Sequence, residues 1–227
     1  WAEALVPHLA PLGKPLVVLM QTPGAVFLPW VGQVAAAANL FLAGEMTGSA
    51  WASLLFGDRS PEGKLPVAFP AGPEDTVPVS QDLHIRYGEG LFTSYRNPRL
   101  NATFPFGHGL SYTTFALGAA SVVGGPECSA EVCARLDVTN SGGRAGTETV
   151  QAYLELQSAK DTPARLLRGF RKTRLLGPGE SQSVLFNFTK RDLSIYQVGA
   201  GWVEQDQVLA HFGVSSADIR QVLQLRG

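Results

Sequence analysis

The sequence has little charge of either sign and no long apolar run. Its 227 residues include 18 Lys and Arg and 19 Asp and Glu, so the formal net charge is −1. This balance is unlike the basic excess that nucleic-acid-binding proteins carry. The longest apolar stretch, residues 35–43, is interrupted by Asn39 and is far shorter than the roughly 20 residues that span a bilayer. We therefore expect no nucleic-acid partner and no membrane span.

Cysteine is scarce, because Cys128 and Cys133 are the only two. A zinc site would need two further ligands nearby, and no His follows within the next seventy residues. The short spacing favours a disulfide that closes a small ring, the alternative being two free buried thiols. The sequence also has no phosphate-binding loop, dinucleotide fingerprint or Ser-His-Asp order, so we expect no metal and no cofactor.

Two N-x-[ST] sequons start at Asn101 and Asn187, and they add to the disulfide as signs of an oxidising compartment. Asn187 falls on the outward-facing positions of an alternating run, where a glycan is tolerated. These features favour a secreted, vacuolar or cell-surface protein. The chain lacks an initiator Met and opens on Trp1, so we expect it to be a fragment or a processed product.

The first half of the chain predicts alternating strands and helices. Residues 14–21 and 38–43 are short apolar runs, typical of strands buried on both faces of a parallel sheet. Pro29 suits the first position of a helix, and apolar residues follow at i, i+4 spacing: Trp30, Val34 and Ala38. A second helix is expected after Gly44, ending at Gly57, with these residues facing inward: Ala50, Leu54 and Leu55. This order predicts part of an α/β domain, because two strands are too few for a complete sheet.

From residue 115 onward, apolar and polar residues alternate with a period of two. The apolar members of the four runs are Val132, Ala134, Leu136 and Val138; Val150, Ala152, Leu154 and Leu156; Val184, Phe186 and Phe188; and Val208, Ala210, Phe212 and Val214. Glycine-rich segments separate the runs, and TNSGGRAG is expected to form a hairpin turn. Short half-buried strands with such turns predict an all-β sandwich. We therefore expect two segments, 1–114 and 115–227, the first of which ends in a turn- and aromatic-rich connector from residue 57.

Glu89 is the most interesting carboxylate, because glycines and aromatic residues surround it, as they often surround sugar sites. With Tyr87 and Tyr95 it could form the rim of a substrate site or contact another domain. The alternative is a buried or interfacial acid paired with Arg86 or Arg96.

Three other polar residues favour structural roles. Glu45 lies in a Gly-bounded turn after a strand, where α/β active sites often lie, but an acid favoured at a helix N-terminus is the preferred explanation. Asp58 opens a turn, as Asp commonly does. His108, between two glycines, has no matching ligands nearby and is poor evidence for a metal site.

Seven motifs occur along the chain in a recognisable order. They are GEMTGSAWASLLFGDRSPEGKLPVAFP, YGEGLFTSYR, FPFGHGLSYTTF, LDVTNSGGRAGTETVQAYL, LLRGF, LLGPGESQSVLF and FGVSSADIR. On these motifs the chain resembles the C-terminal portion of the family-3 glycoside hydrolases. In that family an N-terminal barrel is followed by an α/β sandwich and often by a fibronectin type III-like domain. The resemblance implies that residues 1–114 are the last part of the α/β sandwich and that 115–227 are the fibronectin type III-like domain.

The connector is more similar to that of the β-glucosidase branch than to the Tyr-rich connector of the β-xylosidase branch. One turn departs from the family pattern, since P-G-Q-E-G-G stands here as AGEMTG, with Gly44 and Gly48 kept. The polar content of that turn has therefore changed.

The resemblance implies a retaining glycoside hydrolase that acts on β-linked glucosides. Such enzymes need two carboxyls about 5–5.5 Å apart. In the family the nucleophile lies on the barrel and the acid/base in an earlier part of the α/β sandwich, so both would precede Trp1. We therefore assign no catalytic residue in this chain, and we expect the segment alone to be inactive. Its expected partners are a carbohydrate substrate and the barrel with the first part of the α/β domain, on the same precursor or a second chain.

Two other classes of function fit the same residues. One is a non-catalytic secreted scaffold or surface glycoprotein that retains the hydrolase fold. The other is a carbohydrate-binding or adhesion module built from the β-sandwich. The full-length coding sequence would separate these from the enzyme.

Overall fold

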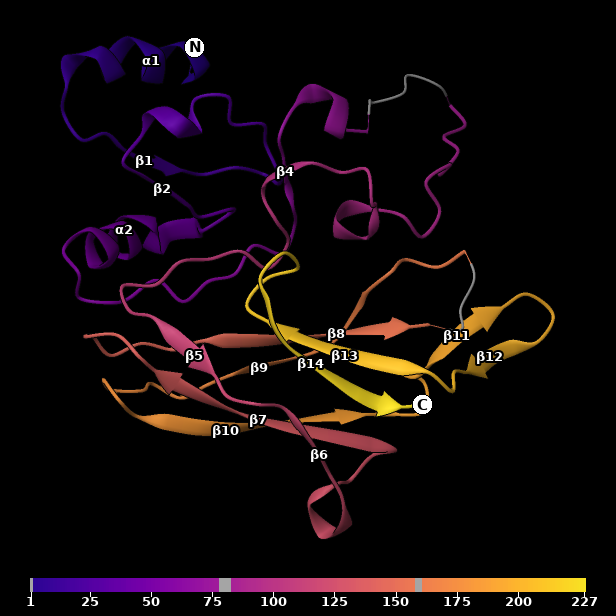
Figure 1. Cartoon of the computed structure of the whole chain (residues 1–227). Coiled ribbons are helices and arrows are strands. Elements are labelled where there is room, and N and C mark those ends of the chain that lie inside the picture. The colour runs from indigo at the N-terminus through magenta and orange to yellow at the C-terminus, as the bar shows by residue number, and fades with distance from the viewer. Residues whose placement is uncertain (1, 78–82, 158–160) are drawn as a thin grey trace.

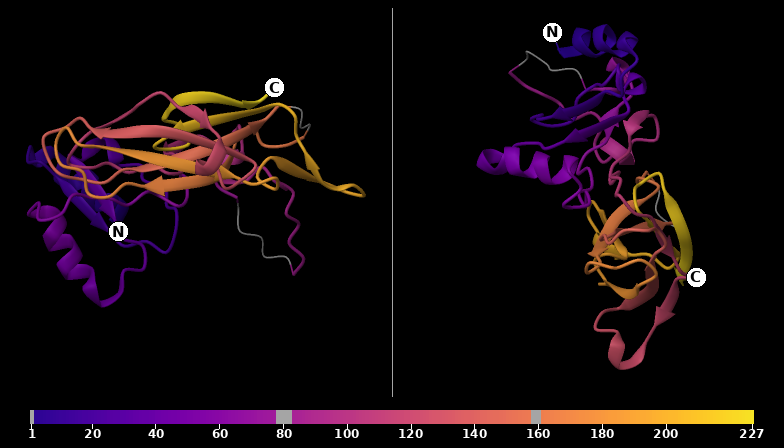
Figure 2. Two further views of the ribbon diagram at one scale, coloured as in Figure 1. Left: turned by 90° about the horizontal axis from the view of Figure 1, so that it is seen from below. Right: turned by 90° about the vertical axis from the view of Figure 1, so that its left-hand side faces the viewer.

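The chain folds as a small α/β part beside a larger β-sandwich, as the computed structural model shows (Figure 1). The structure describes residues 2–77, 83–157 and 161–227. The right-hand view of Figure 2 shows the α/β part above the sandwich, and in Figure 1 much of the magenta connector lies beside the α/β part.

The α/β part is built on two parallel strands, β1 (Val17–Met20) and β2 (Ala36–Asn39). Helices α1 (Ala2–Leu9) and α2 (Thr47–Leu55) lie on opposite sides of this sheet (Figures 1 and 2). Gly57 ends α2 as predicted, because its φ of 76° suits glycine and its N–H bonds the Leu54 carbonyl at 3.2 Å. A small buried core joins the layers: Val6, Leu28, Trp30 and Phe69.

The connector adds one antiparallel pair, β3 (Phe69–Pro70) with β4 (Ala102–Phe104). Short 3-10 helices lie along the chain at Ala10–Leu12, Val31–Gln33, Gly44–Met46, Pro73–Asp75, Ser94–Arg96 and Gly125–Glu127. The connector is therefore mostly turns, as its glycines and prolines predicted.

The predicted helix after Pro29 is wrong. Only a 3-10 turn forms at Val31–Gln33, and Val34 is already extended at φ −116° and ψ 148°. The next strand starts at Ala36, earlier than the predicted range 38–43. Gly32 and the β-branched residues Val31 and Val34 disfavour a helix. The residues that follow pair with β1 and so form a strand. The i, i+4 spacing arises because Trp30 and Val34, on either side of the turn, both pack into the core.

Burial of the α/β elements also differs from the prediction. Val17 is 47% exposed and Ala36 is exposed, so neither strand is buried on both faces in this chain. Ala50 is exposed and Leu55 is 52% exposed, so α2 covers less of the core than its apolar residues suggested. Parallel sheets are normally covered on both faces, and this one is only partly covered by the chain itself.

The sandwich consists of two antiparallel sheets. One contains β5 (Phe115–Leu117), β6 (Ser121–Val123), β7 (Val132–Asn140) and β10 (Ser181–Phe188). The other contains β8 (Thr149–Leu156), β9 (Leu166–Lys172), β13 (Val208–Gly213) and β14 (Ile219–Arg226). A separate hairpin, β11 (Ser194–Gln197) with β12 (Gly201–Glu204), projects from one end (Figure 1).

The four alternating runs lie on β7, β8, β10 and β13, except for Val214 just beyond β13, and their apolar faces meet between the sheets. Val138, Ala152, Phe188 and Phe212 are completely buried there. Several strands were not predicted, including β9 and β14. The residues of β14 alternate between half-buried and exposed, because it is an edge strand whose inward residues are not fully covered.

The TNSGGRAG segment does not form a hairpin turn. It joins β7 to β8, which belong to different sheets, and LGPGES likewise joins β9 to β10 across the sandwich. Asn140 ties the two crossovers together. Its buried carboxamide donates to the carbonyls of Arg144 and Leu176 and accepts from Thr113 Oγ1 at 2.7 Å. A hairpin turn joins two strands that pair with each other in one sheet. Here β7 pairs with β10 and β8 pairs with β13, so the segment between β7 and β8 is a crossover.

Candidate functional site

Polar side chains gather where the two parallel strands end. Asn39, the last residue of β2, donates from Nδ2 to Thr22 Oγ1 at 3.0 Å, and Gln21 donates to Thr47 Oγ1 at 3.0 Å. Ligands of α/β sheets commonly bind at this carboxyl edge. Glu45 lies close by in sequence, but it is exposed and makes no ion pair among the residues that the structure describes. The cluster is hydrogen-bonding and uncharged, so it supplies no carboxylate for acid or base chemistry.

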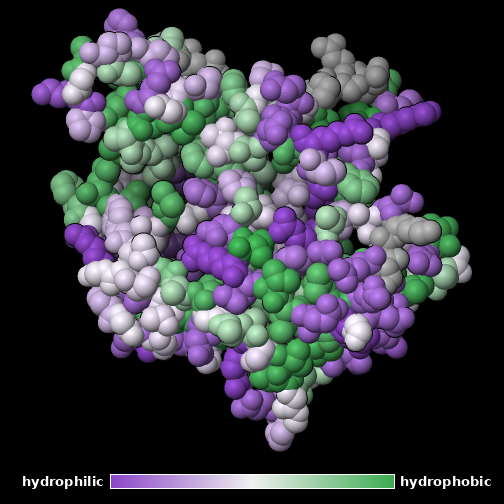
Figure 3. Space-filling view, viewed as in Figure 1, coloured by the Kyte–Doolittle hydropathy of each residue, from purple (hydrophilic) through white to green (hydrophobic). Residues whose placement is uncertain are grey.

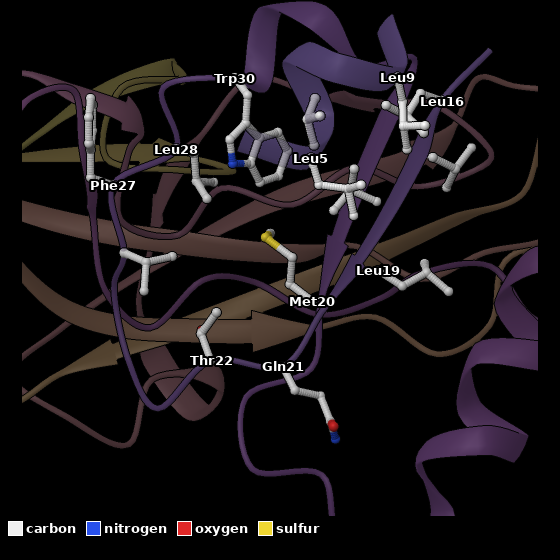
Figure 4. A pocket seen from close by; sticks show the side chains of 14 residues that line it. Leu5, Leu9, Leu16, Leu19, Met20, Gln21, Thr22, Phe27, Leu28 and Trp30 are labelled. Atoms are coloured by element: carbon white, nitrogen blue, oxygen red, sulfur yellow. The ribbon is translucent and has the colours of Figure 1, made fainter. Parts of the chain in front are cut away.

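Two hollows adjoin this edge. The larger, of about 560 Å³, lies between α1, β1 and the loop after β1. Its lining is almost entirely apolar, and Met20 points toward Trp30 and Leu5 across it (Figure 4). The smaller, of about 510 Å³, extends from Gln21 and Thr22 to residues 41–44. An open apolar hollow beside a partly covered strand resembles an unfilled packing surface more than a catalytic pocket.

The predicted rim residues lie in two different surroundings. Tyr87 is 80% exposed, and Glu89 is half-buried with its carbonyl accepting from Phe92 N–H at 2.9 Å. Tyr95 instead turns toward the sandwich, where its ring meets Tyr153 edge to face at 5.7 Å between centroids, and it also stacks on Phe106 of the connector at 4.6 Å. Tyr87 thus faces solvent, whereas Tyr95 is held by contacts within the chain.

The alternative pairing of Glu89 with an arginine is not present. Among the described residues no ion pair joins Glu89 to Arg86 or Arg96, and Arg96 donates to Thr93 Oγ1 at 2.5 Å instead. Asp58 is exposed in its turn. Glu45, Asp58 and Glu89 thus lie on three separate segments.

The motif FPFGHG docks the connector onto the sandwich. Gln151 on β8 donates from Nε2 to the carbonyls of Gly107 and Val214 at 3.1 and 2.9 Å, and Tyr153 Oη donates to Gln151 Oε1. Gly107 has φ of 80°, and a Cβ there would collide with the Gln151 side chain. Burial and the nearby Tyr95 raise the pKa of the Tyr153 hydroxyl, so it stays protonated as a donor. The sequence signal for this contact was limited to Gln151 and Tyr153. In the alternating run they occupy the positions between the apolar residues, which the pattern predicts to face outward.

An ion pair strengthens the same contact. Lys64 Nζ lies 2.8 Å from Glu148 Oε1, with side chains 15% and 9% exposed, and it also donates to the Gly109 carbonyl. His108 stacks on Phe104 with ring centroids 5.1 Å apart. Burial, and secondarily Lys64, lowers the pKa of His108, so it is neutral at pH 7. His108 thus serves in packing.

The predicted disulfide is present. Cys128 and Cys133 are bonded, with Cα atoms 5.5 Å apart, and the bond closes the loop before β7. The two sequon asparagines differ in exposure. Asn101 is exposed, whereas Asn187 is half-buried, with its Oδ1 buried and unpaired and its Nδ2 3.5 Å from Ser129 Oγ.

Two observations concern chemistry and membranes. Within residues 2–77, 83–157 and 161–227, no three His, Cys, Asp or Glu side chains are grouped to hold a metal. None of the helices in these segments is long and apolar enough to cross a membrane.

Comparison with known families explains both parts of the fold. The family model described as "Glycosyl hydrolase family 3 C-terminal domain" matches residues 1–112, and "Fibronectin type III-like domain" matches residues 148–216. An α/β segment followed by such a sandwich is the C-terminal architecture of a class of glycoside hydrolases. The chain belongs to glycosyl hydrolase family 3.

Relatives with this architecture are named β-glucosidases. A "Beta-glucosidase" of Rhizobium radiobacter is 36% identical over 90% of this chain and 26% of its own length. "Thermostable beta-glucosidase B" of Acetivibrio thermocellus is 34% identical over 95% of this chain and 30% of its own length. The β-D-glucoside glucohydrolase of Trichoderma reesei superposes with a TM-score of 0.89 and 32% identity, over 99% of this chain and 35% of that one. The chain thus spans about a quarter to a third of the proteins that it matches.

Proposed function

We propose that the whole protein is a retaining glycoside hydrolase acting on β-linked glucosides, of which this chain is the C-terminal portion. The observation that carries the proposal is the match to relatives named β-glucosidases over nearly the whole chain. Retaining hydrolysis needs two carboxyls about 5–5.5 Å apart. The carboxylates singled out in this chain are dispersed over separate segments, which supports catalytic carboxylates outside residues 1–227.

The experiment compares the full-length protein with residues 1–227. The full-length protein is expected to release p-nitrophenol from p-nitrophenyl β-glucoside with net retention at the anomeric carbon, measured by proton NMR. Residues 1–227 alone are expected to give no turnover, because the carboxyl pair is absent. A full-length protein that binds glucose but hydrolyses no glycoside would favour the non-catalytic scaffold. Turnover by residues 1–227 would contradict the placement of the carboxylates.

The α/β part supports a partner that continues the sheet. Val17 and Leu42 are 47% and 87% exposed, and hydrophobic side chains gather over β1 and β2 in the space-filling view (Figure 3). An exposed apolar face beside an open strand edge is normally covered by more polypeptide. We place the first part of the α/β domain and the barrel there, on the same precursor or on a second chain.

Glu89 and Tyr87 remain candidates for contact with substrate or with the barrel. The Tyr87 side chain is exposed, and half-buried Glu89 keeps part of its surface accessible, so either contact is open to them. In the full-length enzyme, Glu89→Gln is expected to raise KM more than it lowers kcat if Glu89 lies on a substrate rim. Tyr95 is less suited to that role, because its hydroxyl accepts the Leu167 N–H at 3.0 Å in the contact with the sandwich.

The disulfide and the sequons support secretion, or a vacuolar or cell-surface location. We expect a glycan on Asn101 rather than on the half-buried Asn187. Mass spectrometry of non-reduced, alkylated peptides from a secretory host tests both points. The expected result is an intact Cys128–Cys133 linkage and a glycan on the Asn101 peptide, whereas two alkylated thiols would argue against an oxidising compartment.

A further inference from the structure

The β11–β12 hairpin presents two exposed aromatic side chains. Tyr196 and Trp202 face each other across the hairpin and are 63% and 47% exposed. The neighbouring pair, Ile195 and Val203, lies on the opposite face, where Ile195 reaches the sandwich core. The hairpin extends beyond the other strands in both Figure 1 and the left view of Figure 2. The aromatic pair is therefore directed away from the core.

These rings are held in place before any ligand arrives. The Arg191 guanidinium lies 4.4 Å above the Trp202 ring, and Trp202 meets Tyr196 edge to face, with centroids 5.6 Å apart. Arg191 covers one face of the indole, and the edge-to-face contact leaves Tyr196 at least one free ring face. A braced aromatic ring loses little conformational freedom on binding, so its contact area is available at low entropic cost.

The polar groups beside the rings are paired with one another. Glu204, on the same face of the hairpin as Trp202, contacts Lys190 at 3.2 Å and Arg226 at 2.5 Å. Arg226 also contacts Glu131 at 2.7 Å, so these two acids and two bases carry no net charge, and Arg191 adds a single positive charge to a surface of hydrogen-bond donors and acceptors. Such a surface complements a neutral, hydroxyl-rich ligand better than a strongly charged one.

We propose that this platform, defined as Tyr196, Trp202, Arg191, Lys190 and Glu204, binds a glucose unit of a neutral β-glucan chain. In the chair form of β-glucose the ring hydroxyls are equatorial, so each ring face presents C–H groups that can stack on Tyr196. The outward hydroxyls then reach the charged groups at the rim. The proposal rests on the proposed function for its ligand class and extends it to a polymeric substrate.

The test measures binding of the full-length protein to insoluble β-1,4-glucan (cellulose) and β-1,3-glucan (curdlan) by sedimentation at 4 °C. Tyr196→Ala is expected to lower the partition coefficient at least about tenfold, the usual scale for losing a central aromatic contact. Trp202→Ala is expected to lower it several-fold, because Tyr196 loses its brace. Tyr196→Phe keeps the ring and is expected to stay close to wild type. Phe170→Ala removes another exposed aromatic side chain of the sandwich, 62% exposed, and is the matched control.

Three results would overturn the platform: wild type that sediments with neither glucan, Tyr196→Ala that binds like wild type, or Tyr196→Phe that loses as much as Tyr196→Ala. A concentration-dependent dimer that Tyr196→Ala abolishes, without glucan binding, would assign the surface to a second copy instead. Hydrolysis of p-nitrophenyl β-glucoside, measured on every variant, should match wild type and also reports folding. Glucan binding without any hydrolysis would reject the proposed function and support the platform. Hydrolysis without glucan binding would support the proposed function and reject the platform.

Discussion

The two parts of the chain bury their apolar residues to very different extents. The sandwich closes around its own core, in which Val138, Ala152 and Phe188 are fully buried. Among the described residues of the α/β part and its connector only Phe69, at 1% exposed, approaches full burial, and Leu42 and Phe56 are 87% and 84% exposed. Two antiparallel sheets cover each other's inner faces, whereas a parallel sheet depends on layers on both sides and on neighbouring strands. An apolar sequence therefore builds a self-contained core in one case and an open one in the other.

The comparison is tested most directly by dividing the chain at residue 114. We propose that residues 115–227 form a separate folding unit, which is expected to be soluble and to unfold cooperatively in urea. Residues 1–114 are expected to aggregate, because their strand edge and apolar surface stay uncovered. Sedimentation velocity and circular dichroism of each segment measure this. A monomeric, cooperatively folded 1–114 would show that the α/β part needs no partner and would favour the scaffold function.

A matched pair of leucines compares the two cores within the intact 227-residue chain. Leu154→Ala in the sandwich is expected to lower the free energy of unfolding by about 3–5 kcal/mol, because the closed core cannot collapse into the cavity. Leu28→Ala is expected to cost about 2 kcal/mol or less, since Leu28 borders an open hollow that can relax. Urea unfolding followed by fluorescence gives both values. Equal losses would mean that the two cores are equally well packed.

The ion pair between the connector and the sandwich provides a third test. Lys64→Met leaves the buried Glu148 without its partner and is expected to destabilise the chain by about 3 kcal/mol. The double variant Lys64→Met with Glu148→Leu removes both charges and is expected to recover much of that loss. If the double variant is as unstable as the single one, lost packing accounts for the effect rather than an unpaired charge.

The smallest expected effect is a change in the pH dependence of stability, which arises from the Asp218–Arg220 pair of the sandwich. Hydrogen bonds from Arg220 hold the pKa of Asp218 below its ordinary value, so the pair stabilises the fold above the unfolded pKa of about 3.9. That contribution is lost as the pH falls through the lower pKa of the folded state. Arg220→Gln is expected to lower the free energy of unfolding at pH 7 by less than about 1 kcal/mol, since the Asp218–Arg220 pair is partly exposed. Urea midpoints at pH 7 and pH 2.5 should show a smaller difference between variant and wild type in acid. Arg220→Gln also removes the hydrogen bond from Arg220 to the Phe115 carbonyl, but this loss is the same at both pH values and does not affect the difference between them.

The sandwich strands could be predicted because residues such as Leu136 and Val138 alternate with polar neighbours. The segment after Pro29 could not, because spacing alone does not distinguish a helix from a turn that places Trp30 and Val34 in the core. The TNSGGRAG connection shows a further limit. Local residues favour a turn, but which sheet the next strand joins depends on contacts such as Asn140 with Leu176, 36 residues apart. For the candidate site, the disulfide follows from spacing, whereas the contact of Tyr95 with Leu167 could not be predicted, because the two residues lie 72 positions apart.

Asn140 also bears on where the sandwich can change in length. Because one side chain bonds both crossovers, an insertion in either loop would move a carbonyl out of its reach and break several bonds at once. The β11–β12 end has no such shared residue in the described part of the chain, and its tip, with Val198 97% exposed, contacts little else. We expect loop insertions and fused domains to be tolerated at that tip and rejected beside Asn140, so the molecule has one end suited to remodelling and one that is not.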